Sequence, residues 1–204
     1  MDSGNVFDHI YQKEGKAPWT FKEPPKELVE LVDSGALKPC KMLDVGCGEG
    51  YISAYFASKG VDVTGGDISA NAIGLANRHA KKKGVKCKFI RLGWRGLDGK
   101  YDFVLDWRFL HEITDEKERE KYAAIVSGLL RKDGIYLSVA FSGEPRKRKL
   151  RKSPIGVLLY LPANRDLEKL FGAHFNILEK KMIKLPQKEV LGSVTSYFFL
   201  MKKK

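Results

Sequence analysis

The strongest constraint on the fold is a glycine-rich turn, Leu43-Asp44-Val45-Gly46-Cys47-Gly48-Glu49-Gly50. It follows Lys41–Val45, a short and mainly apolar stretch that predicts a β-strand. It precedes residues of helical periodicity, in which Ile52, Tyr55 and Phe56 share one face. Glycines at alternate positions let the backbone turn sharply and approach a ligand closely. A strand, a tight turn and a helix in this order are typical of an open α/β sheet.

The rest of the chain alternates strands and helices. The further strands are expected at Val61–Gly65, Cys87–Leu92, Tyr101–Asp106, Ile135–Phe141, Phe175–Leu185 and Val194–Met201. The further helices are expected at Lys26–Val32, from Ser69 to Gly84, from near Thr114, and at Asn164–Phe171. This order predicts a Rossmann-like, doubly wound, seven-stranded sheet, mostly parallel with an antiparallel C-terminal strand and helices on both faces. Between residues 142 and 162 we expect an irregular basic stretch.

The spacing of the glycines and the position of one distant acid predict the chemical class of the ligand. The glycines follow a GxGxG pattern and not the GxGxxG of dinucleotide-binding proteins. Backbone N–H groups at the start of a helix bind a carboxylate as well as a phosphate. Asp67 ends the next expected strand, 17 residues after Gly50, where its carboxylate can accept hydrogen bonds from both hydroxyls of a ribose. The pair therefore indicates a nucleoside ligand with a small anionic end.

With these residues identified, the sequence resembles the class I S-adenosylmethionine-dependent methyltransferases. The resemblance rests on Leu43–Gly50, Val63–Ser69 and Lys100–Asp106, and the order of elements agrees from about Leu37 to the C-terminus. It implies a cap segment and helix at 1–36 and an S-adenosylmethionine-binding domain at 37–204, compact as a whole. It also implies S-adenosylmethionine as cofactor and S-adenosylhomocysteine as product.

The resemblance assigns most of the cofactor contacts. Gly46 and Gly48 are expected beside the methionine part, with Asp44 nearby. Asp67 is expected to hold the ribose, and Ile68 to pack on the adenine. Further expected contacts are Trp19, Cys47, Gly93, Trp94 and Asp106. The family often has an acid for the adenine amine after the third strand, where this chain has Arg91-Leu92-Gly93-Trp94-Arg95.

A narrower resemblance concerns the acceptor. Lys16-Ala17-Pro18-Trp19 and Asp106-Trp107-Arg108-Phe109-Leu110-His111 look like the thiopurine, tellurite-resistance and plant halide/thiol methyltransferases. Those enzymes methylate small soft nucleophiles, so a thiol, halide or chalcogen anion is the implied acceptor, with a thiol leading. The candidate catalytic residues are Asp106, Arg108 and His111. Arg108 is expected to attract an anionic nucleophile and His111 to take a proton; Tyr11 is a further substrate-side candidate.

The basic charge of the chain leaves two other functions open. Lysine and arginine total 37 against 25 acids, a formal charge of +12, and Arg146–Lys152 holds six cations in seven residues. This run suits a solvated loop, the mouth of a site for an anionic small molecule, or RNA phosphates. The first alternative is therefore an RNA or ribosome-associated methyltransferase. Asp106-Trp107-Arg108-Phe109 stands where amino-directed nucleic-acid enzymes carry an Asn-Pro-Pro-Tyr-type tetrapeptide. The second alternative is a non-catalytic S-adenosylmethionine-binding module.

Composition also bears on the compartment. The cysteines Cys40, Cys47 and Cys87 show no CxxC spacing, so neither a disulfide framework nor a dedicated zinc site is expected. The first residues, Met1–Gly4, show no signal-peptide pattern, and no apolar run approaches the ~18 residues of a membrane span. We therefore expect a cytoplasmic protein without a metal, and its oligomeric state stays open.

Overall fold

The computed structural model describes residues 3–12, 17–20, 22–35, 37, 40–143, 149–153, 156–185 and 195–204. It divides the chain into two compact units, Met1–Leu97 and Asp98–Lys204. Both units combine β-strands with α-helices, and their strands appear in the order that the sequence predicts. Within the described residues, no helix has both the length and the apolar character needed to cross a membrane.

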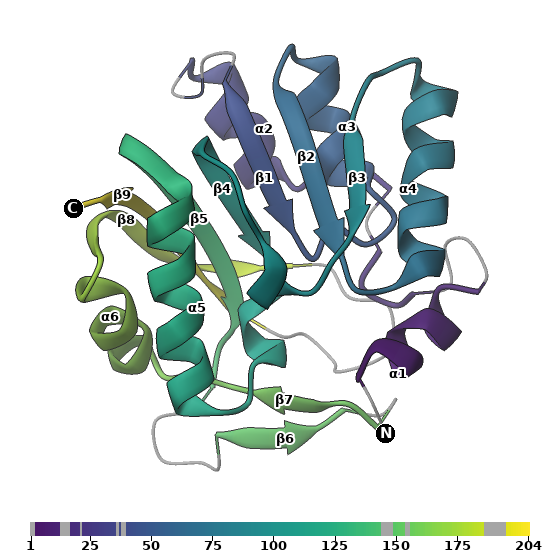
Figure 1. Cartoon of the computed structure of the whole chain (residues 1–204). Helices are drawn as coiled ribbons and strands as arrows, with labels where there is room; N and C mark the ends of the chain where they lie inside the picture. The colour runs from purple at the N-terminus through teal and green to yellow at the C-terminus, as the bar shows by residue number, and fades with distance from the viewer. Residues whose placement is uncertain are drawn as a thin grey trace. The chain divides into compact units, whose positions relative to one another are not determined.

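The first unit is built on three parallel strands (Figure 1). Its strands are β1 (Lys41–Val45), β2 (Asp62–Asp67) and β3 (Lys88–Arg91). Its helices are α1 (Ser3–Ile10), α2 (Lys26–Asp33), α3 (Tyr51–Ser58), α4 (Ala70–Lys83) and the short 3-10 helix η1 (Trp94–Gly96). Strand β2 lies between β1 and β3, and both α3 and α4 pack against it. This arrangement brings the carboxyl ends of the three strands to one edge.

The ends of α4 follow the local sequence. Ser69 caps its first turn, since the Ser69 hydroxyl accepts a hydrogen bond from the Ala72 N–H at 3.1 Å. Gly84 ends the helix with a left-handed φ of +70°. Both positions agree with the sequence-based expectation. Helix α1 was not expected, because the only helix that the sequence predicts within the segment 1–36 is Lys26–Val32.

The four longer strands of the second unit pair with one another. These are β4 (Tyr101–Trp107), β5 (Leu130–Phe141), β8 (Phe175–Lys184) and β9 (Thr195–Lys203). Its helices are α5 (Glu116–Leu129), α6 (Asn164–Gly172) and the short 3-10 helix η2 (Leu110–Glu112). Strand β4 is parallel to β5, whereas β9 is antiparallel to both β5 and β8. The C-terminal strand is therefore antiparallel, as predicted.

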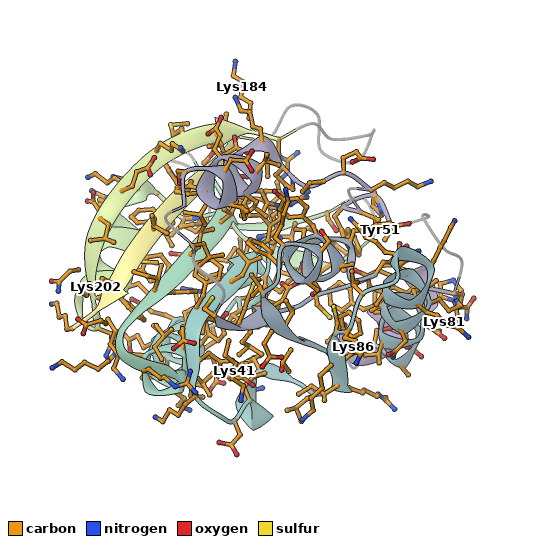
Figure 2. All side chains as sticks on the ribbon, turned by 90° about the horizontal axis from the view of Figure 1, so that it is seen from above. Lys41, Tyr51, Lys81, Lys86, Lys184 and Lys202 are labelled. Atoms are coloured by element: carbon orange, nitrogen blue, oxygen red, sulfur yellow. The ribbon has the colours of Figure 1, made fainter. Side chains whose placement is uncertain are left out.

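Aromatic packing forms much of the core of this second unit. The Phe171 ring contacts Tyr136 of β5 and Phe199 of β9, with centroids 5.6 and 5.4 Å apart. Phe175 lies 5.2 Å from Tyr136, and all four side chains are fully buried. Strand β8 also carries exposed charged side chains. Lys184, for example, is exposed and extends away from the ribbon (Figure 2). Strand β8 thus separates a buried aromatic layer from a charged surface.

One expectation for the second unit is wrong. The stretch between residues 142 and 162 was expected to be irregular, but it contains an antiparallel hairpin of β6 (Leu150–Lys152) and β7 (Leu158–Tyr160). The hairpin forms because Leu159 and Tyr160 are buried, while the cations of β6 stay exposed. Two strands of three residues each are too short for alternation to be recognised in a basic sequence. The cations at 146–148 lie outside the described residues, as does Lys16.

Candidate functional site

The glycine turn has the backbone that its sequence predicts. Gly46, Gly48 and Gly50 have φ values of +69°, +52° and +73°, in the left-handed region that favours glycine. A Cβ added at Gly50 would lie 2.7 Å from the Cβ of Ala76, so α4 leaves no room for a side chain there. The N–H groups of Gly46 and Cys47 donate to the Gly66 carbonyl at 2.8 and 3.1 Å. The turn is therefore held against both β2 and α4.

Asp67 connects this turn to the start of α4. Its Oδ2 accepts the Gly48 N–H at 2.9 Å, and its Oδ1 accepts the Ser69 N–H at 2.9 Å. Burial raises the pKa of the Asp67 carboxyl, although these N–H donors act in the opposite direction. Each carboxylate oxygen has more than one lone pair, so Asp67 keeps acceptor capacity for ligand hydroxyls. The sequence prediction that Gly48 and Asp67 act together agrees with this contact.

Two other residues of the turn are enclosed. Asp44 is buried and accepts a hydrogen bond from the Ser53 hydroxyl at 2.5 Å. The Cys47 sulfur lies 2.9 Å from the position that a Gly65 Cβ would take. Burial raises the pKa of the Cys47 thiol well above its usual value, with Asp67 and Asp44 adding to the effect. Cys47 is therefore a protonated thiol at neutral pH and fills space in the turn.

The N-terminal segment covers this turn through Tyr11 and Trp19. The Trp19 Nε1–H donates to the Tyr11 hydroxyl oxygen at 2.6 Å, and the two rings meet edge to face. A Cβ added at Gly48 would lie 2.8 Å from that same oxygen. Thr20 also donates to the Glu49 carboxylate at 2.8 Å. Trp19 was predicted at the site, and its hydrogen bond brings the Tyr11 hydroxyl to the turn.

Asp8 is a site residue that the sequence analysis missed. Its Oδ1 accepts hydrogen bonds from the Ser69 hydroxyl at 2.7 Å and the Asn71 N–H at 3.0 Å. The Asn71 side chain donates in return to the Asp8 carbonyl at 2.9 Å. These bonds hold the pKa of Asp8 below its usual value and fix α1 to the first turn of α4. The spacing of Phe7, Ile10 and Tyr11 is the only sequence signal for this helix.

The predicted adenine-side residues lie beyond the ends of β2 and β3. Ile68 is 38% exposed, which suits a side chain that packs on a ligand. The Leu92 N–H donates to the Asp67 carbonyl at 2.9 Å, and this bond brings the two strand ends together. Gly93 and Trp94 follow and are half-buried, with the Arg95 guanidinium 4.4 Å from the Trp94 ring. The first unit thus gathers every predicted cofactor contact except Asp106.

Asp106 belongs to the second unit and is fully buried. Its Oδ1 accepts the N–H groups of Phe109 and Leu110 at 2.9 and 3.1 Å. Its Oδ2 accepts the hydroxyls of Tyr122 and Tyr136 at 3.2 and 3.0 Å, with Ser138 at 3.4 Å. Burial raises the pKa of Asp106 to about 6. The carboxylate therefore orders the segment after β4, and its assignment to cofactor and catalysis stays a prediction that this geometry does not favour.

Arg108 and His111 lie close together after β4. The Arg108 guanidinium lies 4.6 Å from the centroid of the Phe141 ring, and the His111 ring stacks on the same ring at 4.0 Å. His111 is buried, and burial together with Arg108 holds its pKa well below its usual value. The imidazole is therefore neutral at pH 7 and a weaker base than a free histidine, and its role as a proton acceptor stays a prediction.

Comparison with known proteins finds a family match over part of the chain. Residues 42–134 match the methyltransferase domain family. The curated 2-heptyl-1-hydroxyquinolin-4(1H)-one methyltransferase of Mycobacteroides abscessus is 27% identical over 128 residues, which are 58% of this chain and 56% of that protein. The chain thus spans about half the length of this relative, and 36% of the ubiquinone biosynthesis O-methyltransferase of Bordetella avium, to which it is 34% identical over 86 residues.

Solved structures of methyltransferases share the fold. The 1,6-didemethyltoxoflavin-N1-methyltransferase of Burkholderia thailandensis, solved with S-adenosylhomocysteine, is 24% identical with a TM-score of 0.76, covering 94% of this chain and 83% of that one. TehB of Haemophilus influenzae is 19% identical with a TM-score of 0.72, covering 91% and 64%. The predicted Rossmann-like fold and the class I resemblance are confirmed, and TehB, at 19% identity, shows the shared fold alone. The cofactor of this family is S-adenosylmethionine.

Proposed function

We propose that this methyltransferase domain binds S-adenosylmethionine at the glycine turn of its first unit and transfers the methyl group to a small molecule. The observation that carries the proposal is the contact between Asp67 and the Gly48 N–H at 2.9 Å. It places a carboxylate that accepts hydroxyls beside a turn whose backbone a ligand approaches closely. A nucleoside with a small charged end suits that combination.

The residues of the first unit fit such a cofactor. Asp67 keeps acceptor capacity for ribose hydroxyls, and the exposed part of Ile68 offers an apolar contact for a base. The Tyr11 oxygen already accepts the Trp19 N–H, so the Tyr11 proton remains for an acceptor on the side of Gly48. When bound, S-adenosylmethionine supplies a methyl group that is already activated on a sulfonium. The chain's own residues therefore orient the reactants and exclude water.

For the acceptor we propose a small soft nucleophile, with a thiol first. The support is the narrower resemblance, together with the match to the fold of TehB. A thiolate attacks without a strong base, which agrees with the absence of a basic imidazole at His111. The relatives include an N1-methyltransferase and O-methyltransferases, so nitrogen and oxygen acceptors belong in the same test.

The cofactor site is tested by Asp67→Ala. We expect the affinity for S-adenosylmethionine, measured by calorimetry, to fall at least about tenfold, since hydrogen bonds to a charged group are lost. The matched control is Asp62→Ala, which removes an exposed carboxylate at the start of the same strand. Unchanged affinity in Asp67→Ala, with a folded protein by circular dichroism, would contradict the assignment.

The acceptor class is tested by a screen with methyl-labelled cofactor against thiols, halides, chalcogen anions, phenols, amines and RNA. We expect label in the small soft nucleophiles. Label that accumulates in RNA and disappears at high salt would favour an RNA methyltransferase instead. Cofactor binding without label in any acceptor would favour a non-catalytic binding module.

A further inference from the structure

The Arg108 guanidinium and the His111 imidazole both pack against the Phe141 ring in the second unit. Arg108 directly follows β4, His111 lies in η2, and Phe141 ends β5. The rings of His111 and Phe141 stack with centroids 4.0 Å apart and planes 24° apart, and the Arg108 guanidinium lies 4.6 Å from the Phe141 centroid. The carboxyl ends of parallel strands are where open α/β sheets bind ligands. The cluster lies at the carboxyl ends of β4 and β5, the place where this rule expects a ligand.

The imidazole of this cluster has an available nitrogen. His111 is 3% exposed, and among the described residues its Nδ1 has no hydrogen-bond partner. The Glu112 carboxylate lies 3.6 Å from Nε2, beyond hydrogen-bond distance. Of the elements packed on η2, β5 contributes the apolar Phe141, and β7 contributes Tyr160, whose ring carries the Arg119 guanidinium at 3.5 Å. Burial and the nearby Arg108 nevertheless disfavour a charge on the His111 ring and hold its pKa well below its usual value.

The backbone of Arg108 has a strained, left-handed conformation. Its φ is +72°, a left-handed conformation that is unfavourable for a residue other than glycine. The Arg108 N–H donates to the Val139 carbonyl at 2.7 Å, which fixes this conformation against β5. Strained residues of this kind are concentrated at ligand sites. The strain therefore supports a role for Arg108 beyond packing.

The neighbouring hairpin adds positive charge at the same edge. Strand β7 packs against η2, and β6 exposes Arg151 and Lys152. Next to these cations, Leu150 and Leu158 are 38% and 45% exposed. Cations on such an edge attract anions and raise their rate of encounter. Exposed leucines beside them suit an anion with an apolar body.

We propose that this cluster receives the methyl acceptor as an anion that has already lost its proton, with Arg108 as its counter-charge and His111 as a neutral hydrogen-bond partner. This inference rests on the proposed function and specifies its acceptor: an ionisable thiol or hydroxyl on an apolar body. In the transfer, the acceptor's electron pair forms the bond to the methyl carbon while the carbon–sulfur bond breaks and its electrons return to sulfur. The anionic and sulfonium charges cancel, and no proton is released in this step.

The pH dependence of turnover tests whether the acceptor loses its proton in solution or to a group on the protein. The acceptors are aromatic thiols and phenols of similar size whose own pKa values span about 5 to 10. We expect kcat/KM to rise with pH and level off at the pKa of each acceptor, so that the break moves with the acceptor. A break at one fixed pH for every acceptor would show that a group on the protein takes the proton, and would overturn the inference.

A binding measurement tests the same point without turnover. A nitrophenol absorbs in the visible only as its anion, so its spectrum reports its ionisation in the complex with S-adenosylhomocysteine. We expect the bound probe to be ionised about one pH unit below its free pKa, because Arg108 stabilises the anion. A neutral spectrum for the bound probe would overturn the inference.

Variants of Arg108 separate its charge from its conformation. Arg108→Asn removes the cation and tolerates the left-handed backbone, and we expect kcat/KM for anionic acceptors to fall about 10- to 100-fold. Arg108→Lys keeps a cation and is expected to recover most of that loss. The control is Arg131→Gln, which removes a cation paired with Asp102 on the surface. Equal losses in Arg131→Gln and Arg108→Asn would overturn the inference.

Failure of this inference is distinct from failure of the proposed function. A wild-type chain that binds no S-adenosylmethionine and methylates no acceptor would overturn both. Turnover with a fixed pH break would overturn only the anionic acceptor and would leave the methyltransferase proposal in place.

Discussion

The Tyr11 hydroxyl is a polar group of the N-terminal segment that lies against Gly48 of the glycine turn. Its oxygen accepts the Trp19 N–H, and its own proton has no acceptor among the hydrogen bonds of the described residues. In Tyr11→Phe this proton is absent while the ring remains. We expect the affinity for S-adenosylmethionine to fall about two- to tenfold, the range for a neutral hydrogen bond, as measured by calorimetry.

A second tyrosine of the same unit provides the control for Tyr11. The Tyr55 hydroxyl is buried in α3 without a hydrogen-bond partner among the described residues. We expect Tyr55→Phe to leave the affinity unchanged, because no cofactor contact is assigned to that helix face. Similar losses of affinity in both variants would mean that the tyrosines act through packing of the unit and not through a contact of Tyr11.

At the scale of single residues, the sequence identified backbone requirements better than side-chain directions. The glycines at 46, 48 and 50 take the left-handed conformations that their pattern predicts. The surroundings of the Asp106 carboxylate carry no such local signal, since its donors include Tyr122 and Tyr136, 16 and 30 residues away. A glycine pattern is local, whereas the direction of a buried carboxylate depends on which distant hydroxyls surround it.

The docking of α1 on α4 is the element-level feature with the clearest consequence for the site. Asp8 supplies the acceptor at the first turn of α4, where a negative charge is favourable. In Asp8→Ala we expect the Asn71 amide to exchange its hydrogen about fivefold faster, the effect of losing one helix-cap contact. Affinity for S-adenosylmethionine should fall with it, because α1 positions the segment that carries Tyr11.

The pH dependence of this effect has a definite sign. The folded pKa of Asp8 is lowered, so its contribution is present above its unfolded pKa of about 3.9 and is lost as pH falls through the folded value. The difference in exchange between wild type and Asp8→Ala should therefore shrink below about pH 4. Glu23→Ala, which removes an exposed carboxylate between α1 and α2, is the control. A difference that stays constant down to the lowest pH would count against the contact.

Helices and strands were predictable from the sequence where residues at their own ends, or their own apolar pattern, define their bounds. Ser69 and Gly84 fix the ends of α4, and the buried apolar pattern of Lys41–Val45 reproduces β1 residue by residue. Helix α1 and the hairpin of β6 and β7 were missed for a common reason. Both are short, and each is stabilised by contacts with other elements, such as Asp8 on Asn71, 63 residues away. No local pattern carries that information.

At the scale of the whole molecule, Asp106 links the stability of the fold to pH. Its pKa is about 6 in the folded chain and about 3.9 when unfolded. The raised folded pKa means that its contribution to stability is fully present below about pH 4 and is lost as pH rises through about 6. Relative to Asp106→Asn, the wild type should gain up to about 3 kcal/mol between pH 7 and pH 4, measured by urea denaturation.

Taking the difference between wild type and Asp106→Asn isolates this one carboxyl. The buried His111 acts in the opposite direction, since its folded pKa is lowered and its contribution is lost as pH falls through about 6.5. That effect is common to both proteins and cancels. Tyr55→Phe removes no group that titrates in this range, so its difference from wild type should stay flat. If the Asp106 difference is flat as well, the carboxyl is ionised in the folded chain throughout, and its five donors outweigh the cost of its burial.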